Sequence, residues 1–203
     1  MFPLRSGFAA LLLVFPAAAA AQDSTTVDTT PFRSGQWAAL FSGGLAIASL
    51  GVMRFTAPTR AWLLDFSFSG GHSRGTSRLN DSLVTDGFSS NADVNARVGR
   101  RFYQARGKSV ASFQTLGVLG GFHHACGGQT AGPGVCANGW HAGAFGELGG
   151  AYLITQRFSI GGTASVAFSY SRSTARGSGG STNKYWAYDG SVQGLSFAAT
   201  VYF

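Results

Sequence analysis

The sequence predicts an all-β protein, a transmembrane antiparallel up-and-down β-barrel of eight strands, and three observations lead to this fold class. Only 11% of the 203 residues are charged and 45% are hydrophobic, whereas soluble domains average about 25% charged residues. Beyond the N-terminal segment, no stretch reaches the roughly 18 uninterrupted apolar residues of a membrane-spanning helix. Apolar side chains recur instead at every second position, which is typical of strands that face lipid on one side.

The chain begins with a segment that has the layout of an export signal. Arg5 supplies a positive charge, residues 8–15 form a short apolar run, and small residues end at Ala21 in an A-x-A pattern. This arrangement is typical of a cleaved signal peptide. A membrane-anchoring helix is the alternative, but it needs about 20 apolar residues, and Pro16 interrupts this run. We expect residues 1–21 to be removed, residues 22–35 to form a flexible tail and residues 36–203 to form the barrel.

The alternation of apolar and small polar residues marks the strands. It is clearest in residues 158–171, where Phe158, Ile160 and the following even positions are mostly apolar and the odd positions are small or polar. A strand in a soluble sheet would normally carry Lys, Glu and Arg on its second face. Small polar side chains suit a narrow barrel interior instead. Six segments of this kind lie between Ala61 and Phe203.

The connections between these segments alternate in length. Short links such as residues 154–157 alternate with long Gly/Ser/Asn-rich links at residues 73–90, 125–138 and 172–184, as in bacterial outer-membrane barrels. Because such barrels have an even number of strands, residues 36–42 and 45–55 should add two strands joined by a two-residue turn at Gly43-Gly44. One long strand over this region is the alternative, and it would contradict the total of eight.

The chain ends on a strand with a recognisable pattern. Along it, Leu195, Phe197, Ala199, Val201 and Phe203 alternate with Ser196, Ala198, Thr200 and Tyr202. With this strand the chain resembles the small OmpA/OmpX-type outer-membrane barrels, whose terminal aromatic residue is read as an insertion signal. Ser196, Val201 and Phe203 match that signal, whereas Ala198 stands where glycine is commoner. The resemblance implies export to the outer membrane and, as partners, periplasmic chaperones and the barrel-insertion machinery.

Charged residues on the inward face are predicted to pair inside the barrel. Eight strands leave an interior just wide enough for side chains, so an open channel is not expected. An isolated buried charge is costly, and we therefore expect an ion-pair network that fills the lumen. A proton or ion path through the same residues is the alternative. The predicted members are Asp65, Asp93, Arg97, Arg101 and Glu147.

Aromatic residues near strand ends are predicted to form girdles at the two membrane interfaces. A platform for stacking carbohydrate is the alternative. The residues concerned are Trp37, Phe55, Trp62, Phe102, Tyr103, Trp140, Tyr152, Phe158, Tyr170, Tyr185, Trp186 and Tyr188.

Two cysteines, Cys126 and Cys136, flank a Gly-rich segment. An exported chain passes through an oxidising compartment, so we expect a disulfide between them. A metal site is the alternative, because His123 and His124 lie close by in the sequence. Their spacing matches no zinc pattern, and we predict neither a metal nor a cofactor.

The predicted function is that of a non-enzymatic, monomeric outer-membrane protein whose extracellular loops serve surface contact or envelope integrity. A carrier or sensor of a small apolar ligand is one alternative, and a lipid A-modifying enzyme with its site at the rim is another. For such an enzyme, His123 and His124 lie at the outer end of a strand. However, no serine stands two residues after either, and a nucleophile needs a base within hydrogen-bond reach.

The net charge of +7 does not indicate nucleic acid. Its arginines are scattered rather than clustered with stacking aromatics, and export removes the chain from the cytoplasm. Outer-membrane lipids are the better-placed partner, and basic residues in or beside the long links could pair with lipopolysaccharide phosphates. These residues are Arg74, Arg78, Arg172, Arg176 and Lys184.

Overall fold

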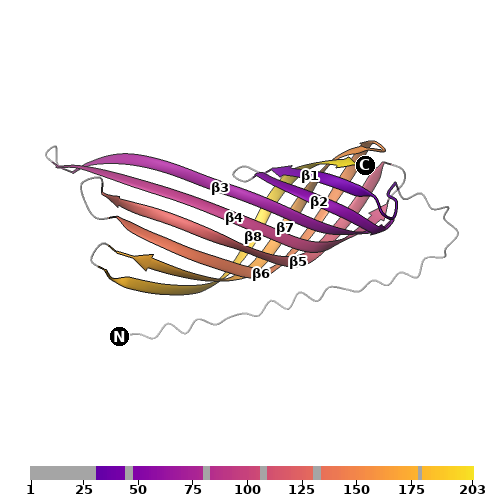
Figure 1. Cartoon of the computed structure of the whole chain (residues 1–203). Coiled ribbons are helices and arrows are strands. Elements are labelled where there is room, and N and C mark those ends of the chain that lie inside the picture. The colour runs from indigo at the N-terminus through magenta and orange to yellow at the C-terminus, as the bar shows by residue number, and fades with distance from the viewer. Residues whose placement is uncertain (1–30, 44–47, 80–82, 106–108, 130–133, 178–179) are drawn as a thin grey trace, which may run out of the picture.

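The structure, a computed structural model, describes residues 31–43, 48–79, 83–105, 109–129, 134–177 and 180–203. The expected signal peptide and most of the expected tail lie outside the described residues. Within them, no helix is long and apolar enough to cross a membrane. The strands are β1 (Trp37–Gly43), β2 (Ala48–Ala57), β3 (Arg60–Leu79), β4 (Leu83–Ala105), β5 (Val110–Gln129), β6 (Val135–Thr155), β7 (Phe158–Arg176) and β8 (Thr182–Tyr202), shown in Figure 1.

These strands form one closed antiparallel barrel in chain order, with β1 completing the ring against β8. The predicted all-β up-and-down barrel is therefore confirmed, as are the two strands before Ala61. The expected two-residue turn at Gly43-Gly44 is wrong, because Gly43 pairs with Ala48 and the connection comprises residues 44–47. The hydroxyls of Ser42 and Ser49 hydrogen-bond across the pair, which favours this register.

The outward face of the barrel carries a belt of exposed apolar side chains. On β5, Leu116, Val118 and Phe122 point outward, whereas Phe113 is buried in the lumen. Both even and odd positions of this strand carry apolar residues, so alternation alone does not show which set faces the lipid. On β6, Phe145 interrupts the apolar pattern because it also lies in the lumen, where it is 5% exposed. An apolar exterior around small or paired interior residues is the arrangement expected of a barrel in lipid.

The three long links predicted as loops are mostly strand, which corrects that interpretation. β3 and β4 stay paired up to Leu79 and Leu83, and the β5–β6 and β7–β8 pairs also extend far beyond the apolar belt. Threonine favours extended backbone, and the hydroxyls of Ser and Thr can hydrogen-bond across a strand pair. Ser73 and Ser89 are joined by a hydrogen bond of 2.8 Å between their Oγ atoms, and Thr76 Oγ1 donates to Asp86 Oδ1 at 2.9 Å.

The strands differ greatly in length, and this divides the barrel into two parts. β1 and β2 have 7 and 10 residues, whereas β3 to β8 have 19 to 23. β1 pairs with β8 only as far as Phe197, and β2 pairs with β3 only as far as Phe68. Beyond these points, among the described residues, one edge of β3 and one edge of β8 have no strand partner.

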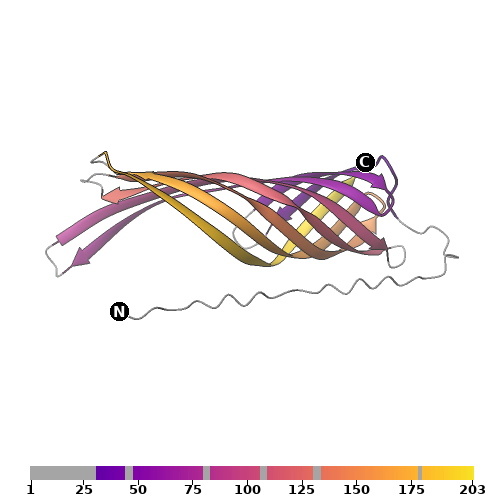
Figure 2. The same ribbon diagram turned by 90° about the horizontal axis from the view of Figure 1, so that it is seen from below.

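The six longer strands continue past the β1–β2 hairpin as an open trough (Figures 1 and 2). Residues 70–76 of β3 and 182–192 of β8 are exposed at every position, on both faces of the sheet. We call the closed end of the barrel, with the short connections at residues 58–59 and 156–157, the turn end. The opposite end, where the long hairpins terminate, is called the hairpin end.

Candidate functional site

Four of the predicted charged residues meet in the middle of the lumen. Asp65 on β3 stands directly opposite Arg97 on β4, and Arg97 donates to Asp65 Oδ2 from Nε at 3.1 Å and also from Nη2. Arg97 Nη1 donates to Glu147 Oε1 at 2.9 Å, and Arg101 Nη2 donates to Glu147 Oε2 at 2.9 Å. The two carboxylates and two guanidiniums balance in charge. We call Asp65, Arg97, Arg101 and Glu147 the lumen network.

Three members of the lumen network are shielded from water, and the side chain of the fourth, Arg97, is 25% exposed. Asp65, Arg101 and Glu147 are 1%, 3% and 5% exposed. Arg101 also donates from Nε to Thr115 Oγ1 at 2.8 Å, and its guanidinium carbon lies 4.1 Å from the ring centroid of Phe113. Removing one partner of such a buried set leaves an uncompensated charge. The four side chains therefore depend on one another and fill the section of the barrel that they occupy.

Asp93 was predicted to join this network, and the structure corrects that assignment. It lies on the same face of β4 but four residues beyond Arg97, which is about 13 Å along a strand at roughly 3.3 Å per residue. That separation is too large for an ion pair. Asp93 instead stands opposite His123 on β5 and interacts electrostatically with His141 on β6, in the part of the lumen that opens into the trough.

A cluster of aromatic rings closes the turn end. Phe32 inserts between three rings, with centroid distances of 4.8 Å to Phe55, 4.6 Å to Tyr103 and 5.4 Å to Tyr202. All four side chains are at most 4% exposed. We call these four residues the aromatic seal. Together with the lumen network it fills two successive sections of the barrel.

The aromatic seal changes two expectations from the sequence. The tail was expected to be flexible through residue 35, yet Phe32 is buried and Gly35 donates its backbone N–H to the carbonyl of Phe55 at 2.8 Å. Phe55 and Tyr103 were expected in an interfacial girdle, but their parity turns them inward. In the sequence, Phe32 is a single aromatic residue at the end of a polar segment. That segment has no periodicity, so no pattern predicts that Phe32 is buried.

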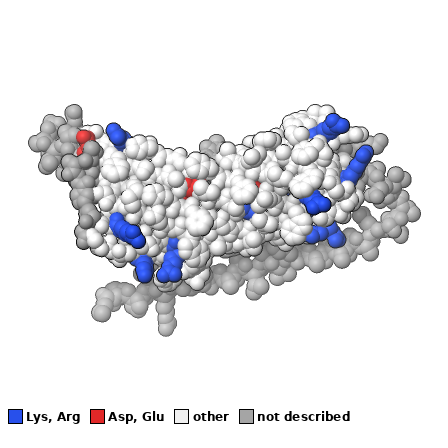
Figure 3. Space-filling view, in the orientation of Figure 1, with Lys and Arg blue, Asp and Glu red and all other residues white. Residues whose placement is uncertain are grey.

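The basic residues of the long hairpins lie on the outward side. Arg74, Arg172, Arg176 and Lys184 are exposed, whereas the side chain of Arg78 lies outside the described residues. In Figure 3, Lys and Arg gather towards the two ends of the molecule, and little acidic surface is visible between them. The hairpin end therefore offers cations to its surroundings.

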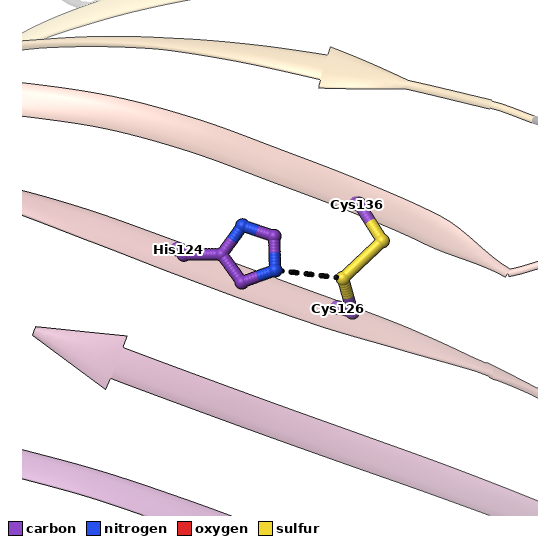
Figure 4. A group of neighbouring side chains, drawn as sticks. All are labelled: His124, Cys126 and Cys136. Atoms are coloured by element: carbon purple, nitrogen blue, oxygen red, sulfur yellow. Dashed lines mark hydrogen bonds between the residues drawn. A yellow bond between two sulfur atoms is a disulfide. The ribbon is translucent and has the colours of Figure 1, made fainter.

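The two cysteines are bonded to each other across the β5–β6 hairpin. Cys126 and Cys136 occupy directly opposite positions and form a disulfide. His124 lies beside them, with Nε2 3.2 Å from Cys126 Sγ and Nδ1 2.6 Å from Asn138 Oδ1, as Figure 4 shows for the sulfur contact. One ligand atom from each of His124, Cys126 and Cys136 lies within 4.8 Å of the others. While the disulfide is intact neither sulfur is a thiolate, which is the form that binds metal.

The neighbouring His123 points away from this disulfide. It lies over Gly139 on the lumen side, where an added Cβ would collide with its imidazole. Within the described part of the chain, no hydroxyl group is hydrogen-bonded to His123, His124 or His141.

The residues of the predicted insertion signal lie on the last strand at the turn end. Val201 and Phe203 are exposed on the outward face, and Ser196 and Ala198 point inward. The backbones of Phe203 and Trp37 exchange two hydrogen bonds of 3.0 and 3.1 Å. The C-terminus therefore helps to close the ring.

Comparisons with known proteins identify solved structures that share this fold. No protein-family model matches the chain, and no curated protein sequence matches it. A major outer membrane protein from Thermus thermophilus superimposes with a TM-score of 0.56 at 12% identity, covering 83% of this chain and 99% of the other. The outer membrane protein OprG from Pseudomonas aeruginosa superimposes with a TM-score of 0.52 at 12% identity, covering 84% and 97%. The chain has the fold of the small β-barrels found in bacterial outer membranes.

Proposed function

We propose that this chain is a monomeric, non-enzymatic outer-membrane protein whose long hairpins act outside the cell in surface contact or envelope integrity. The turn end would face the periplasm and the hairpin end would face the exterior, as is usual for barrels with short periplasmic turns and long extracellular connections. The exposed apolar belt supports insertion into lipid. Export and removal of residues 1–21 are part of this proposal.

The observation that carries the proposal is the filled lumen. The lumen network and the aromatic seal occupy successive sections of the closed barrel, and the network carries no net charge to attract an ion. A sealed barrel has no route for solutes between its two ends. The function would therefore depend on the outward surface, the trough and the hairpins rather than on transport through the closed barrel.

Conductance in planar lipid bilayers tests this directly. We expect the purified wild-type barrel to give no stable conductance steps, because both plugging sections are built from tightly packed side chains. Arg97→Ala should weaken the fold, since Asp65 would lose its partner, without opening a path past the aromatic seal. Reproducible channel steps from the wild type would contradict the proposal.

The outward cations indicate the surroundings of the hairpins. Arg74, Arg172, Arg176 and Lys184 would stand where lipopolysaccharide phosphates lie, and guanidinium groups bind phosphate through paired hydrogen bonds.

Insertion into the membrane would follow the OmpA/OmpX-type route, in which periplasmic chaperones and the insertion machinery recognise Ser196, Val201 and Phe203. Depletion of that machinery should leave the chain protease-sensitive in the periplasm.

A second candidate function is a carrier for a small apolar ligand, and the unpaired edges of β3 and β8 favour it. A ligand that enters the trough from outside would meet no strand between these edges and could pass sideways into the lipid. Cells with and without the gene would then differ in the uptake of a fluorescent alkyl probe. Equal uptake would leave the surface-contact function as the better account.

A further inference from the structure

The corner formed by His124, Cys126 and Cys136 holds an arrangement that a structural disulfide does not require. His124 and Cys126 are two residues apart on β5 and so share a face, and Cys136 stands directly across from Cys126 on β6. These three residues supply one nitrogen and two sulfur atoms within 4.8 Å of one another. The disulfide alone would need only the two cysteines.

The orientation of the His124 ring is the second observation. Its Nδ1 lies 2.6 Å from Asn138 Oδ1, and an amide oxygen can only accept a hydrogen bond. With Oδ1 facing Nδ1, the tautomer that satisfies this contact carries its hydrogen on Nδ1 and turns the lone pair of Nε2 toward Cys126 Sγ at 3.2 Å. A disulfide sulfur has no hydrogen to donate to that lone pair. Histidine ligands of metals are held in the same way, by an outer partner that binds the other ring nitrogen.

We propose that reduction of the Cys126–Cys136 disulfide converts this corner into a three-ligand site for a divalent transition metal ion such as Zn²⁺. The ligands are the two thiolates and His124 Nε2, and Asn138 holds the imidazole in the binding tautomer. Two sulfurs and one imidazole favour zinc and other soft or borderline ions over calcium or magnesium. The fourth tetrahedral position remains for water or an external ligand.

The chemistry balances with an external thiol reductant. Two thiol groups of the reductant lose two electrons and two protons and join in a disulfide, while the Cys126–Cys136 bond breaks and each sulfur gains a proton. The metal ion then displaces both thiol protons to solvent as it binds the two thiolates. His124 is exposed and both cysteines are partly accessible, so reductant and ion can reach the site from the hairpin end.

Cadmium binding to the folded full-length barrel in detergent tests the proposal. The protein is reduced with an excess of a dithiol under anaerobic conditions, the reductant is removed, and Cd²⁺ is titrated while the thiolate-to-metal absorption is followed. We expect one ion per reduced chain and none for the oxidised chain. Competition with a chromogenic chelator then gives the affinity for Zn²⁺.

Matched variants identify the ligands. His123→Ala changes the adjacent histidine, which faces the lumen, and should leave the affinity unchanged. Asn138→Ala should weaken binding by about 10- to 100-fold through loss of the orienting hydrogen bond, and His124→Ala should weaken it further. His124→Gln serves if the alanine variant fails to fold. Failure of the reduced wild type to bind, equal binding by the oxidised protein, or wild-type affinity after loss of the His124 imidazole would each overturn the proposal.

Discussion

Replacing Glu147 with alanine is expected to lower the free energy of unfolding by about 3–5 kcal/mol, the usual cost of breaking a buried ion pair from one side. Glu147 accepts from Arg97 and from Arg101 at 2.9 Å each. Without it Arg101, which is 3% exposed, would keep its positive charge in the lumen with no carboxylate. Urea unfolding of the barrel in lipid vesicles, followed by tryptophan fluorescence, would measure the loss.

Asp86→Ala is the matched control for this experiment. Asp86 is an exposed carboxylate near the hairpin end that accepts a hydrogen bond from Thr76. Its removal should cost no more than about 1 kcal/mol, as for other exposed polar contacts. If Glu147→Ala were no more destabilising than Asp86→Ala, the lumen network would not be the buried, mutually dependent cluster described above.

Replacing Phe32 with alanine is expected to cost about 3–5 kcal/mol as well, the range observed for truncating a buried phenylalanine. The ring of Phe32 touches Phe55, Tyr103 and Tyr202, all of them buried, so its removal would leave a cavity among these three rings. Urea unfolding is again the measurement. The result is informative because Phe32 precedes the first strand.

Arg33→Ala controls for effects of altering the segment before β1. Arg33 is exposed and uses its backbone N–H to bind Gln36 Oε1, so alanine preserves that contact. The variant should unfold like the wild type. If Phe32→Ala also unfolded like the wild type, Phe32 would be a loosely attached part of the tail, as the sequence had suggested, and the aromatic seal would consist of three rings.

Much of the fold can be predicted from the sequence, because a strand of a membrane barrel alternates apolar residues facing lipid with small or polar residues facing the lumen. In β7, residues 158–171 carry their apolar side chains mainly on the exposed outward face and their small side chains mainly on the inward face. The lumen network follows from the same parity, since Asp65, Arg97, Arg101 and Glu147 all fall on inward positions. Charged side chains that share a narrow barrel interior must pair with one another, because an unpaired buried charge is costly.

The remaining features depend on distances that alternation does not encode. Asp93 has the correct parity for the lumen network but lies too far along β4. The hairpin segments read as loops because Gly, Ser and Asn are common in turns, whereas their cross-strand hydroxyl pairs hold them extended. The trough arises from the unequal lengths of β1 and β2 relative to β3 and β8, and a Gly-Gly pair marks a turn without saying which residues will pair across it.

The arrangement of the four tryptophans tests most directly the central claim, which is a lipid-facing exterior around a filled lumen. Trp37, Trp62, Trp140 and Trp186 all point outward and are 40–70% exposed. In vesicles whose acyl chains are brominated close to the headgroup, we predict strong quenching of most of the tryptophan emission. Aqueous iodide should quench only the smaller share that comes from Trp186, which lies on the hairpin part of β8. Emission that is quenched by iodide and unaffected by brominated lipid would contradict the account.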